Sequence, residues 1–131
     1  MNLPTQAALA RYGAIKVTTA SPGQILLMLY DGLLRFLREA EAAMAAKDRK
    51  KSGEKISRAQ AIIAQLLASL DPAQAPALCQ HLQSVYVFCM QHILRANIEQ
   101  DPAKLAEVTR ILSPLRDAWM TAVAEVASAG R

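Results

Sequence analysis

The chain has 131 residues, of which 53% are hydrophobic and only 5% aromatic, and its formal net charge is +4. This length is enough to bury the core of one domain without disulfides or bound metal. Ala and Leu supply much of the apolar content, so the composition predicts an all-α fold rather than a sheet. Charged residues interrupt the longest apolar run before the roughly 18 residues of a membrane span, and the apolar island at residues 7–10 is too short for a cleaved signal. We therefore expect a cytoplasmic protein with no stable membrane insertion.

Ser21 predicts the start of the first helix. Pro22 follows at the first helical position, and Gln24 stands three residues after Ser21, which completes a capping box. Apolar residues then keep helical spacing from Leu26 to about Ala46.

A second helix is predicted to begin after Asp48, which can cap it, and to carry a broad apolar stripe from Ile56 to Leu70. Gly53 lies inside this helix and weakens it by up to about 1 kcal/mol relative to Ala. The Asp-Pro pair at residues 71–72 and a further proline at residue 76 break the chain before a third helix. The core stripe expected on the third helix comprises Leu78, Leu82, Val85, Cys89, Ile93 and Ala96.

A fourth helix is predicted from Asp101 as cap and Pro102 at the first position, with Pro114 expected to kink or break it. Four amphipathic helices joined by short turns favour an antiparallel up-down four-helix bundle over residues 21–127. Residues 1–20 are expected to form a mobile N-terminal arm.

The sequence offers little material for catalysis or for a cofactor. His81 and His92 are about 16 Å apart on one helix, too far to share a metal ion. Cys79 and Cys89 are about 15 Å apart, too far for a disulfide. There is no Cys-rich cluster and no Gly-rich phosphate loop. We expect neither an enzyme nor a cofactor-binding protein.

The surplus positive charge lies between Lys47 and Arg58, where six basic residues stand against two acidic ones. Such a basic hairpin attracts phosphate, so a nucleic-acid-binding bundle is one alternative. It lacks interleaved aromatic residues, however, and a solvated turn is the preferred interpretation, with no nucleic acid as partner. Asp31 and Arg35 are expected to form an exposed i, i+4 ion pair on the first helix. The basic residues are Lys47, Arg49, Lys50, Lys51, Lys55 and Arg58.

The chain carries more apolar residues than one core requires. Residues 85–94 include eight apolar residues in ten, whereas a core-facing helix needs about three in seven. Several of them fall off the expected core stripes, namely Tyr86, Val87, Met90 and Leu94 on the third helix and Ile25, Leu27 and Leu34 on the first. A thicker core, a homodimer face and an exposed groove for an amphipathic or extended peptide are the alternatives. The candidate partner-binding residues are Tyr12, Ile15, Val17, Ile63, Leu67, Tyr86, Met90 and Leu94.

Many of these residues closely resemble the flagellin-specific export chaperone family, FliS, from Tyr12 to about Ala122. The resemblance at the start of the chain lies in Tyr12, Val17 to Pro22, Leu29 to Gly32, Leu33 and Arg35 to Leu37. It continues with Ala59, Gln60, Ile62, Ile63, Leu66 and Ser69 to Asp71, then with Tyr86, Ala96 and Asn97, and finally with Glu107, Val108, Leu112 and Leu115 to Trp119. The chain departs from the family at Ala75-Pro76 and at Val87, Gln91 and His92, which affects the third-helix surface and not the fold.

The resemblance implies a cytoplasmic bundle that holds the C-terminal segment of newly made flagellin, prevents its premature polymerisation and delivers it to the flagellar type III export apparatus. Two roles are open for the arm around Tyr12, Ile15 and Val17. It covers the groove when no client is bound, or it contacts a component of the export gate. A homodimer is a possible further partner.

Overall fold

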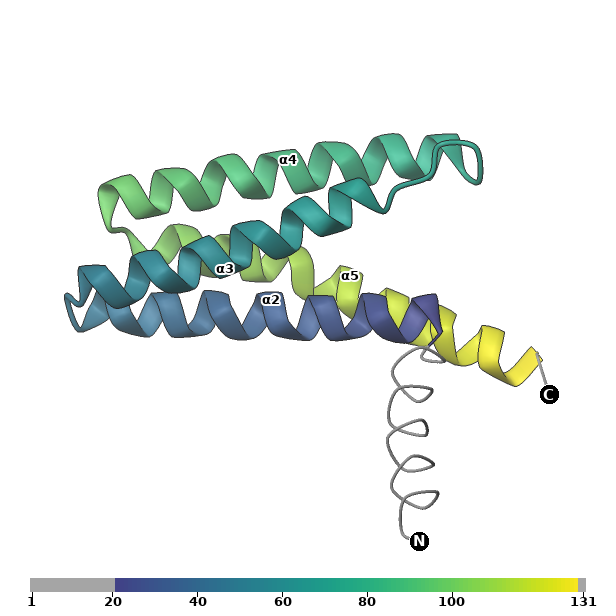
Figure 1. The fold of residues 1–131 in the computed structure, drawn as a ribbon, viewed down its shortest axis with the longest axis horizontal. Coiled ribbons are helices and arrows are strands. Elements are labelled where there is room, and N and C mark those ends of the chain that lie inside the picture. Colours follow the sequence, from purple (N-terminus) through teal and green to yellow (C-terminus); the bar gives the residue numbers. More distant parts are fainter. Residues whose placement is uncertain (1–20, 130–131) are drawn as a thin grey trace, which may run out of the picture.

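The computed structural model describes residues 21–129, which form an antiparallel bundle of α-helices (Figure 1). Helices α2 and α4 each pack against both α3 and α5, so that consecutive helices are neighbours and α2 lies diagonally across the bundle from α4. The predicted all-α, up-down bundle is therefore confirmed, while the expected arm of residues 1–20 lies outside the described residues. The helices are α2 (Pro22–Ala45), α3 (Arg49–Ala68), α4 (Pro76–Glu99) and α5 (Pro102–Ala129).

Side-chain caps fix where three of these helices begin. The Ser21 hydroxyl accepts the backbone N–H of Gln24 at 3.1 Å, and the Gln24 side chain accepts the N–H of Ser21 at 3.1 Å, which is the predicted capping box. The Asp48 carboxylate caps α3 by accepting the backbone N–H of Lys51 at 3.1 Å. The Asp101 carboxylate accepts the backbone N–H of Ala103 at 3.0 Å. These starts are local properties of the chain, and the sequence predicts all three correctly.

Pro114 does not break the fourth helix. The prediction allowed a kink or a break, and the break is wrong, because helix α5 is continuous from Pro102 to Ala129. A proline inside a helix leaves the carbonyl four residues earlier without its amide partner. Here that carbonyl belongs to Arg110, and both Arg110 and Pro114 are exposed, so water can satisfy the free carbonyl.

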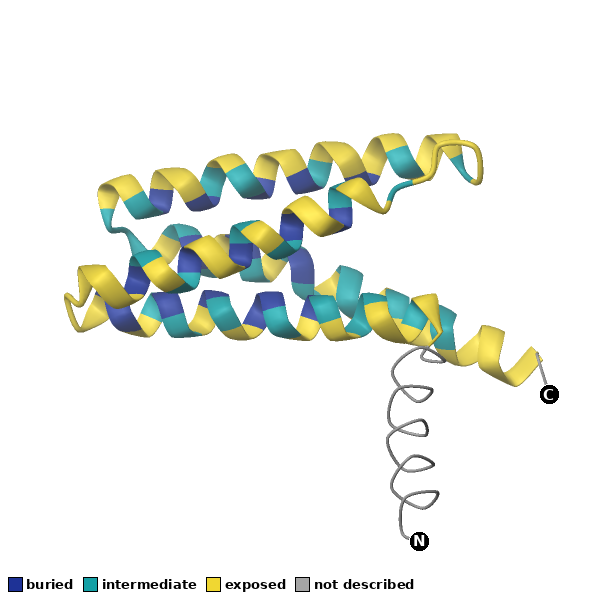
Figure 2. Cartoon of the chain, viewed as in Figure 1, coloured by how far each residue is buried: buried dark blue, intermediate teal, exposed yellow. Residues whose placement is uncertain are grey.

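The core holds a hydrogen-bonded tyrosine pair that joins the two diagonal helices. The hydroxyl oxygens of Tyr30 on α2 and Tyr86 on α4 are 2.5 Å apart, and both side chains are buried. Burial raises the pKa of both hydroxyls, and it raises the pKa of the neighbouring Cys89 thiol to about 11. Figure 2 shows the buried positions on the inner sides of the helices. Apolar side chains from all four helices, such as Leu33, Ile63 and Leu105, complete this core.

The Asp31 carboxylate pairs with a different arginine from the one expected. Arg116 on α5 donates from Nε to Asp31 Oδ1 at 2.8 Å and from its Nη2 to Oδ2 at 3.3 Å. This bidentate contact raises the pKa of Arg116 and ties α5 to α2. Arg35 instead lies over the ring of Phe36, so the predicted i, i+4 pair is wrong. Helical spacing allows a local pair but does not exclude a better partner on the next helix.

Replacing Gly53 or Gly23 by Ala is expected to have opposite effects on the free energy of unfolding. A Cβ at Gly53 on α3 would meet no atom within 4 Å. Gly53→Ala is therefore expected to raise the free energy of unfolding by roughly 0.5 to 1 kcal/mol, since Ala restricts the unfolded chain. A Cβ at Gly23 would lie 2.6 Å from Val123 Cγ2, so Gly23→Ala is expected to lower the free energy of unfolding by about 1 to 3 kcal/mol. Urea unfolding monitored by circular dichroism measures both, and equal effects would contradict the packing of α2 on α5.

Candidate partner-binding surface

The outer side of α4 carries an apolar stripe that none of α2, α3 and α5 covers. Val87, Leu94 and Ile98 are 39%, 53% and 70% exposed. Spacings of seven and four residues place them on one helix face, and Tyr86 and Ile93 on the opposite, core-facing side are buried. We call these three residues the α4 outer stripe. Such an uncovered row of large apolar side chains is typical of a binding surface.

The edge of α4 that borders α5 is held by a short chain of contacts. The Phe88 ring, about half exposed, stacks on His92 with centroids 5.2 Å apart and an interplanar angle of 17°. His92 Nε2 lies 2.5 Å from the Glu107 carboxylate on α5. These contacts hold Phe88 beside the α4 outer stripe and extend the apolar surface toward α5.

The other edge of α4 borders α3. The Gln60 side-chain amide on α3 donates to the backbone carbonyl of Met90 on α4 at 2.9 Å. Gln60 and Leu67 are seven residues apart and share the edge of α3 that faces α4. The side chains of Leu67 and Met90 are half-buried against the core, while Leu94 stands exposed beyond them. The seam between α3 and α4 therefore has an apolar floor next to the α4 outer stripe.

Three predicted partner-binding residues, Leu67, Met90 and Leu94, lie along this seam, but two others are out of reach. Ile63 and Tyr86 are 0% and 1% exposed, so a partner cannot touch them while the bundle is closed. The expectation that Tyr86 falls off the core stripe is wrong, because Tyr86 shares the helix face of the buried residues Leu82 and Cys89, and its hydroxyl pairs with that of Tyr30.

The remaining predicted site residues, Tyr12, Ile15 and Val17, lie outside the described residues. Among the apolar residues expected outside the core stripe of the first helix, Leu34 is buried, Leu27 is half-buried and Ile25 is exposed. The exposed residues Phe88 and Ile98 did not figure among the predicted site residues. Phe88 lies in the apolar run of residues 85–94, and helical spacing from Val87 and Leu94 is the signal that could have identified Ile98.

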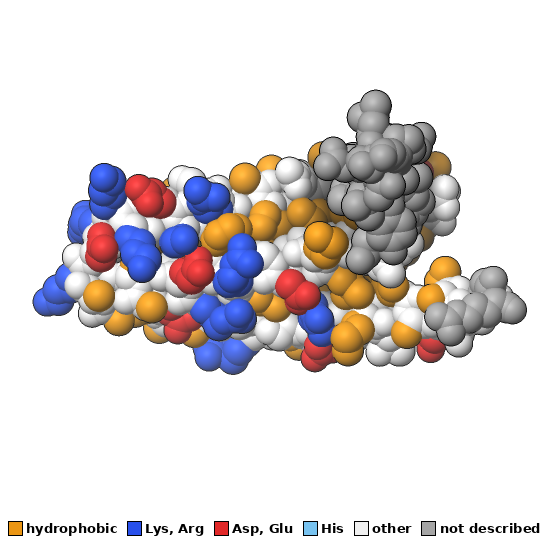
Figure 3. Space-filling model, turned by 60° about the horizontal axis from the view of Figure 1, so that its bottom comes forward, with side chains coloured by type: hydrophobic (Ala, Val, Ile, Leu, Met, Phe, Trp, Pro, Cys, Tyr) orange, Lys and Arg blue, Asp and Glu red, His pale blue; other side chains and the backbone are white. Residues whose placement is uncertain are grey.

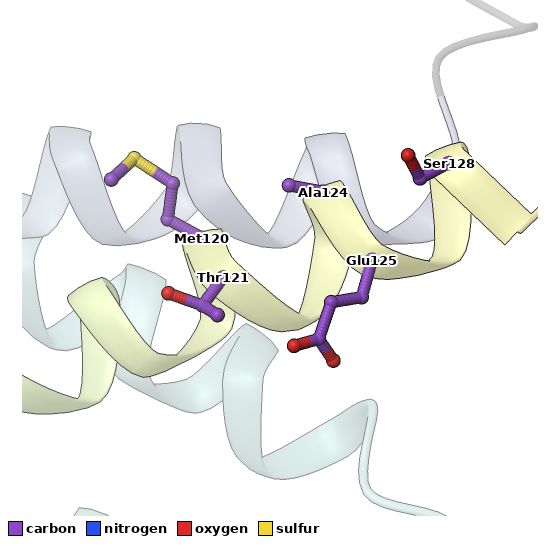
Figure 4. Close-up of a pocket in the computed structure, with 5 residues that line it drawn as sticks. All are labelled: Met120, Thr121, Ala124, Glu125 and Ser128. Atoms are coloured by element: carbon purple, nitrogen blue, oxygen red, sulfur yellow. The ribbon is translucent and has the colours of Figure 1, made fainter.

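Helix α5 carries a surface depression near its C-terminal end. Figure 4 shows a shallow depression whose lining residues all come from α5: Met120, Thr121, Ala124, Glu125 and Ser128. It is open surface along one helix, and the Thr121 hydroxyl donates to the Asp117 carbonyl rather than to Glu125. Within residues 21–129, no group of three or more His, Cys, Asp or Glu side chains is placed to hold a metal ion. Across the same residues, no helix combines the length and hydropathy required to cross a membrane.

Comparison with known proteins decides the family. The family model described as "Flagellar protein FliS" matches residues 5–126. This chain belongs to the FliS family. The flagellar secretion chaperone FliS of Bacillus subtilis is 35% identical to it over 112 residues, which cover 86% of this chain and 83% of that protein. The FliS chaperone of Escherichia coli is 33% identical over 104 residues, covering 79% of this chain and 76% of that protein.

A solved structure supports the fold independently of these sequences. The crystal structure of a bacterial flagellar chaperone superposes on this chain with a TM-score of 0.76, covering 93% of this chain and 99% of that one, at 18% identity. The family is one of flagellar export chaperones and not of enzymes, so the resemblance found in the sequence and the expectation of a non-catalytic protein are both confirmed.

Proposed function

We propose that this FliS-family chaperone binds the C-terminal segment of flagellin in the cytoplasm, prevents its premature polymerisation and delivers it to a component of the flagellar export gate. The α4 outer stripe carries the proposal. A chaperone for a segment that is unfolded when free must offer apolar surface in advance, and Val87, Leu94 and Ile98 do so on a helix that is well packed on its other side.

The seam between α3 and α4 extends the proposed client site. Leu67 and Met90 supply its apolar floor, and the hydrogen bond from Gln60 to the Met90 carbonyl keeps the two helices in register. A client that lies along this seam and over the α4 outer stripe buries its own apolar residues there. Ordering the client costs several kcal/mol of the gross interaction, which keeps the complex reversible enough for handover.

Calorimetry of this chain with a synthetic flagellin C-terminal peptide tests the proposal, supported by gel filtration of the mixture. We expect a measurable heat of binding, a negative heat-capacity change from apolar burial, and co-elution of the two components. Absence of both heat and complex would overturn the proposal. A homodimer that buries the α4 outer stripe is the alternative. It would appear as a dimer in light scattering of the chain alone, without affinity for the peptide.

The N-terminal arm, residues 1–20, is proposed to cover the client site when flagellin is absent. A cap that is closed part of the time lowers the apparent affinity by the closed fraction. Deletion of residues 1–16 is therefore expected to tighten peptide binding, as measured by calorimetry. Unchanged or weaker affinity would contradict a cap. If deletion impairs flagellin secretion and leaves peptide binding intact, the arm contacts the export gate instead.

A further inference from the structure

The seam between α2 and α3 gathers cationic side chains around one aromatic ring. The Arg35 guanidinium on α2 lies 4.9 Å from the centroid of the Phe36 ring, and Lys55 Nζ and the Arg58 guanidinium on α3 lie 5.7 Å and 5.8 Å from it. Lys51 is one turn before Lys55 on the same edge of α3. We call Arg35, Lys51, Lys55 and Arg58 the cationic rim. Cations from two helices thus converge on one point of the surface.

Within residues 21–129, Glu39 is the one carboxylate that forms an ion pair with this rim. Glu39 Oε1 lies 3.0 Å from Lys55 Nζ, and this hydrogen bond, with smaller contributions from Arg35 and Lys51, lowers the pKa of Glu39. Arg35 and Arg58 form no ion pair with any side chain in residues 21–129. Like charges held close together repel unless an anion lies between them, so the rim favours an acidic ligand. Figure 3 shows most of the Lys and Arg of this face on one half of it, with Asp and Glu side chains among them.

The floor beneath the cationic rim is apolar. Phe36, Leu29 and Ile62 are half-buried and pack against the core from the two helices. Gly32 has no side chain to fill the space between them, and an added Cβ there would sit 3.4 Å from Ile62 Cδ1. The α2–α3 seam therefore offers both cations and apolar contact, which is the complement of an acidic amphipathic helix.

We propose that the α2–α3 seam docks an acidic amphipathic helix of a second protein. Lys51, Lys55 and Arg58 are four and three residues apart, so they recur once per helical turn over about 10 Å. Acidic residues at the same spacing on a ligand helix face these cations one by one. Arginine also binds carboxylates through two parallel hydrogen bonds, which makes Arg35 and Arg58 the strongest contacts.

Nucleic acid fits this seam less well. Single-stranded nucleic acid requires an open aromatic face on which bases stack, but cations lie around the Phe36 ring and its other contacts are with the core.

The docking site lies apart from the proposed client site. The cationic rim borders α2, and the α4 outer stripe is on the diagonally opposite helix. Helix α3 presents Lys55 and Arg58 toward α2 and Gln60 toward α4, so its two edges serve different seams. Both ligands are therefore expected to bind at once, and the inference goes beyond flagellin binding.

Fluorescence anisotropy with a labelled 18-residue helical peptide tests the proposal. The probe has Leu on one face and Glu at the i, i+4 and i+7 positions flanking it, and a second probe has Lys in place of Glu. We expect the Glu probe to bind with an affinity that falls as salt is added, and the Lys probe not to bind. Arg35→Glu with Arg58→Glu is expected to weaken the Glu probe at least about tenfold, and Arg35→Gln with Arg58→Gln less than that.

A matched control reverses the charge of two exposed arginines that lie outside the cationic rim, Arg95 on α4 and Arg110 on α5. Arg95→Glu with Arg110→Glu makes the same change in net charge and is expected to leave binding of the Glu probe within about twofold. The proposal would be overturned if both double variants lost the same affinity for the Glu probe, or if the Glu probe did not bind the unaltered chain. Tighter binding of a single-stranded oligonucleotide or of anionic lipid vesicles at this rim would also overturn it, as would displacement of the Glu probe by a flagellin C-terminal peptide.

Discussion

Replacing Val87 and Leu94 together by Asp is expected to weaken binding of a flagellin C-terminal peptide at least about 100-fold. Burying one such aliphatic side chain is worth roughly 1.5 to 3 kcal/mol, and a carboxylate in its place must lose its hydration when the client covers it. Each 1.4 kcal/mol lost lowers the affinity about tenfold. Calorimetry with the peptide measures the change. Both side chains point to solvent, so the free energy of unfolding is expected to fall by no more than about 1 kcal/mol.

Met28 and Val126 supply the matched control, because they are exposed apolar residues on α2 and α5, away from α4. Met28→Asp with Val126→Asp introduces the same two carboxylates and is expected to leave the peptide affinity within about threefold. If this control loses as much affinity as the change on α4, the client does not lie on the α4 outer stripe. Full affinity in the α4 variant would lead to the same conclusion.

The tyrosine pair in the core is expected to show strong coupling. Tyr30→Phe or Tyr86→Phe alone leaves the other hydroxyl buried without its partner, which is expected to lower the free energy of unfolding by about 1 to 3 kcal/mol. The double change to Phe removes both hydroxyls and is expected to cost less than the sum of the single changes. Urea unfolding of the four proteins measures this cycle, and additive effects would show that the two hydroxyls do not depend on each other.

Alkaline pH gives a second measurement on the same pair. Because burial raises the pKa of Tyr30 and Tyr86 above the usual value of about 10, the folded chain keeps protons that the unfolded chain releases. The free energy of unfolding should therefore fall as the pH rises above about 10. The pKa of Cys89 is raised to about 11, and its titration makes the same contribution to the pH dependence of unfolding in the starting protein and in the double Phe variant. A shallower decline in the double Phe variant is expected, and identical pH profiles would argue against the pair's burial.

Fold class and helix starts could be read from the sequence because they depend on neighbouring residues. Ser21 with Gln24 and Asp48 with the following turn cap their helices through contacts three residues apart. The spacing of apolar residues likewise predicts four amphipathic helices, and short turns make neighbours antiparallel. Pro114 is the exception in one respect, since the break that the sequence allowed does not occur in the continuous helix α5, where Arg110 and Pro114 are both exposed.

The surface could be predicted only in part. Spacing correctly suggested that α4 carries more apolar residues than its core face needs, and Val87 and Leu94 are indeed exposed. The prediction wrongly placed Tyr86 off the core stripe, although Tyr86 lies four residues after Leu82 and three before Cys89 and so shares their helix face. The buried Tyr86 hydroxyl has its hydrogen-bond partner in Tyr30, 56 residues earlier in the chain, which spacing within one helix cannot reveal.

The sequence by itself determined the family, the helical fold and the helix starts, since these rest on residue types and on contacts within a few residues. The tertiary structure alone decided that Asp31 pairs with Arg116 rather than Arg35, and that Arg35 and Arg58 meet over Phe36. These contacts join residues on different helices, and their formation depends on the rotation of each helix in the bundle. The pattern within one helix limits that rotation to a face, and packing against the neighbouring helices selects the orientation.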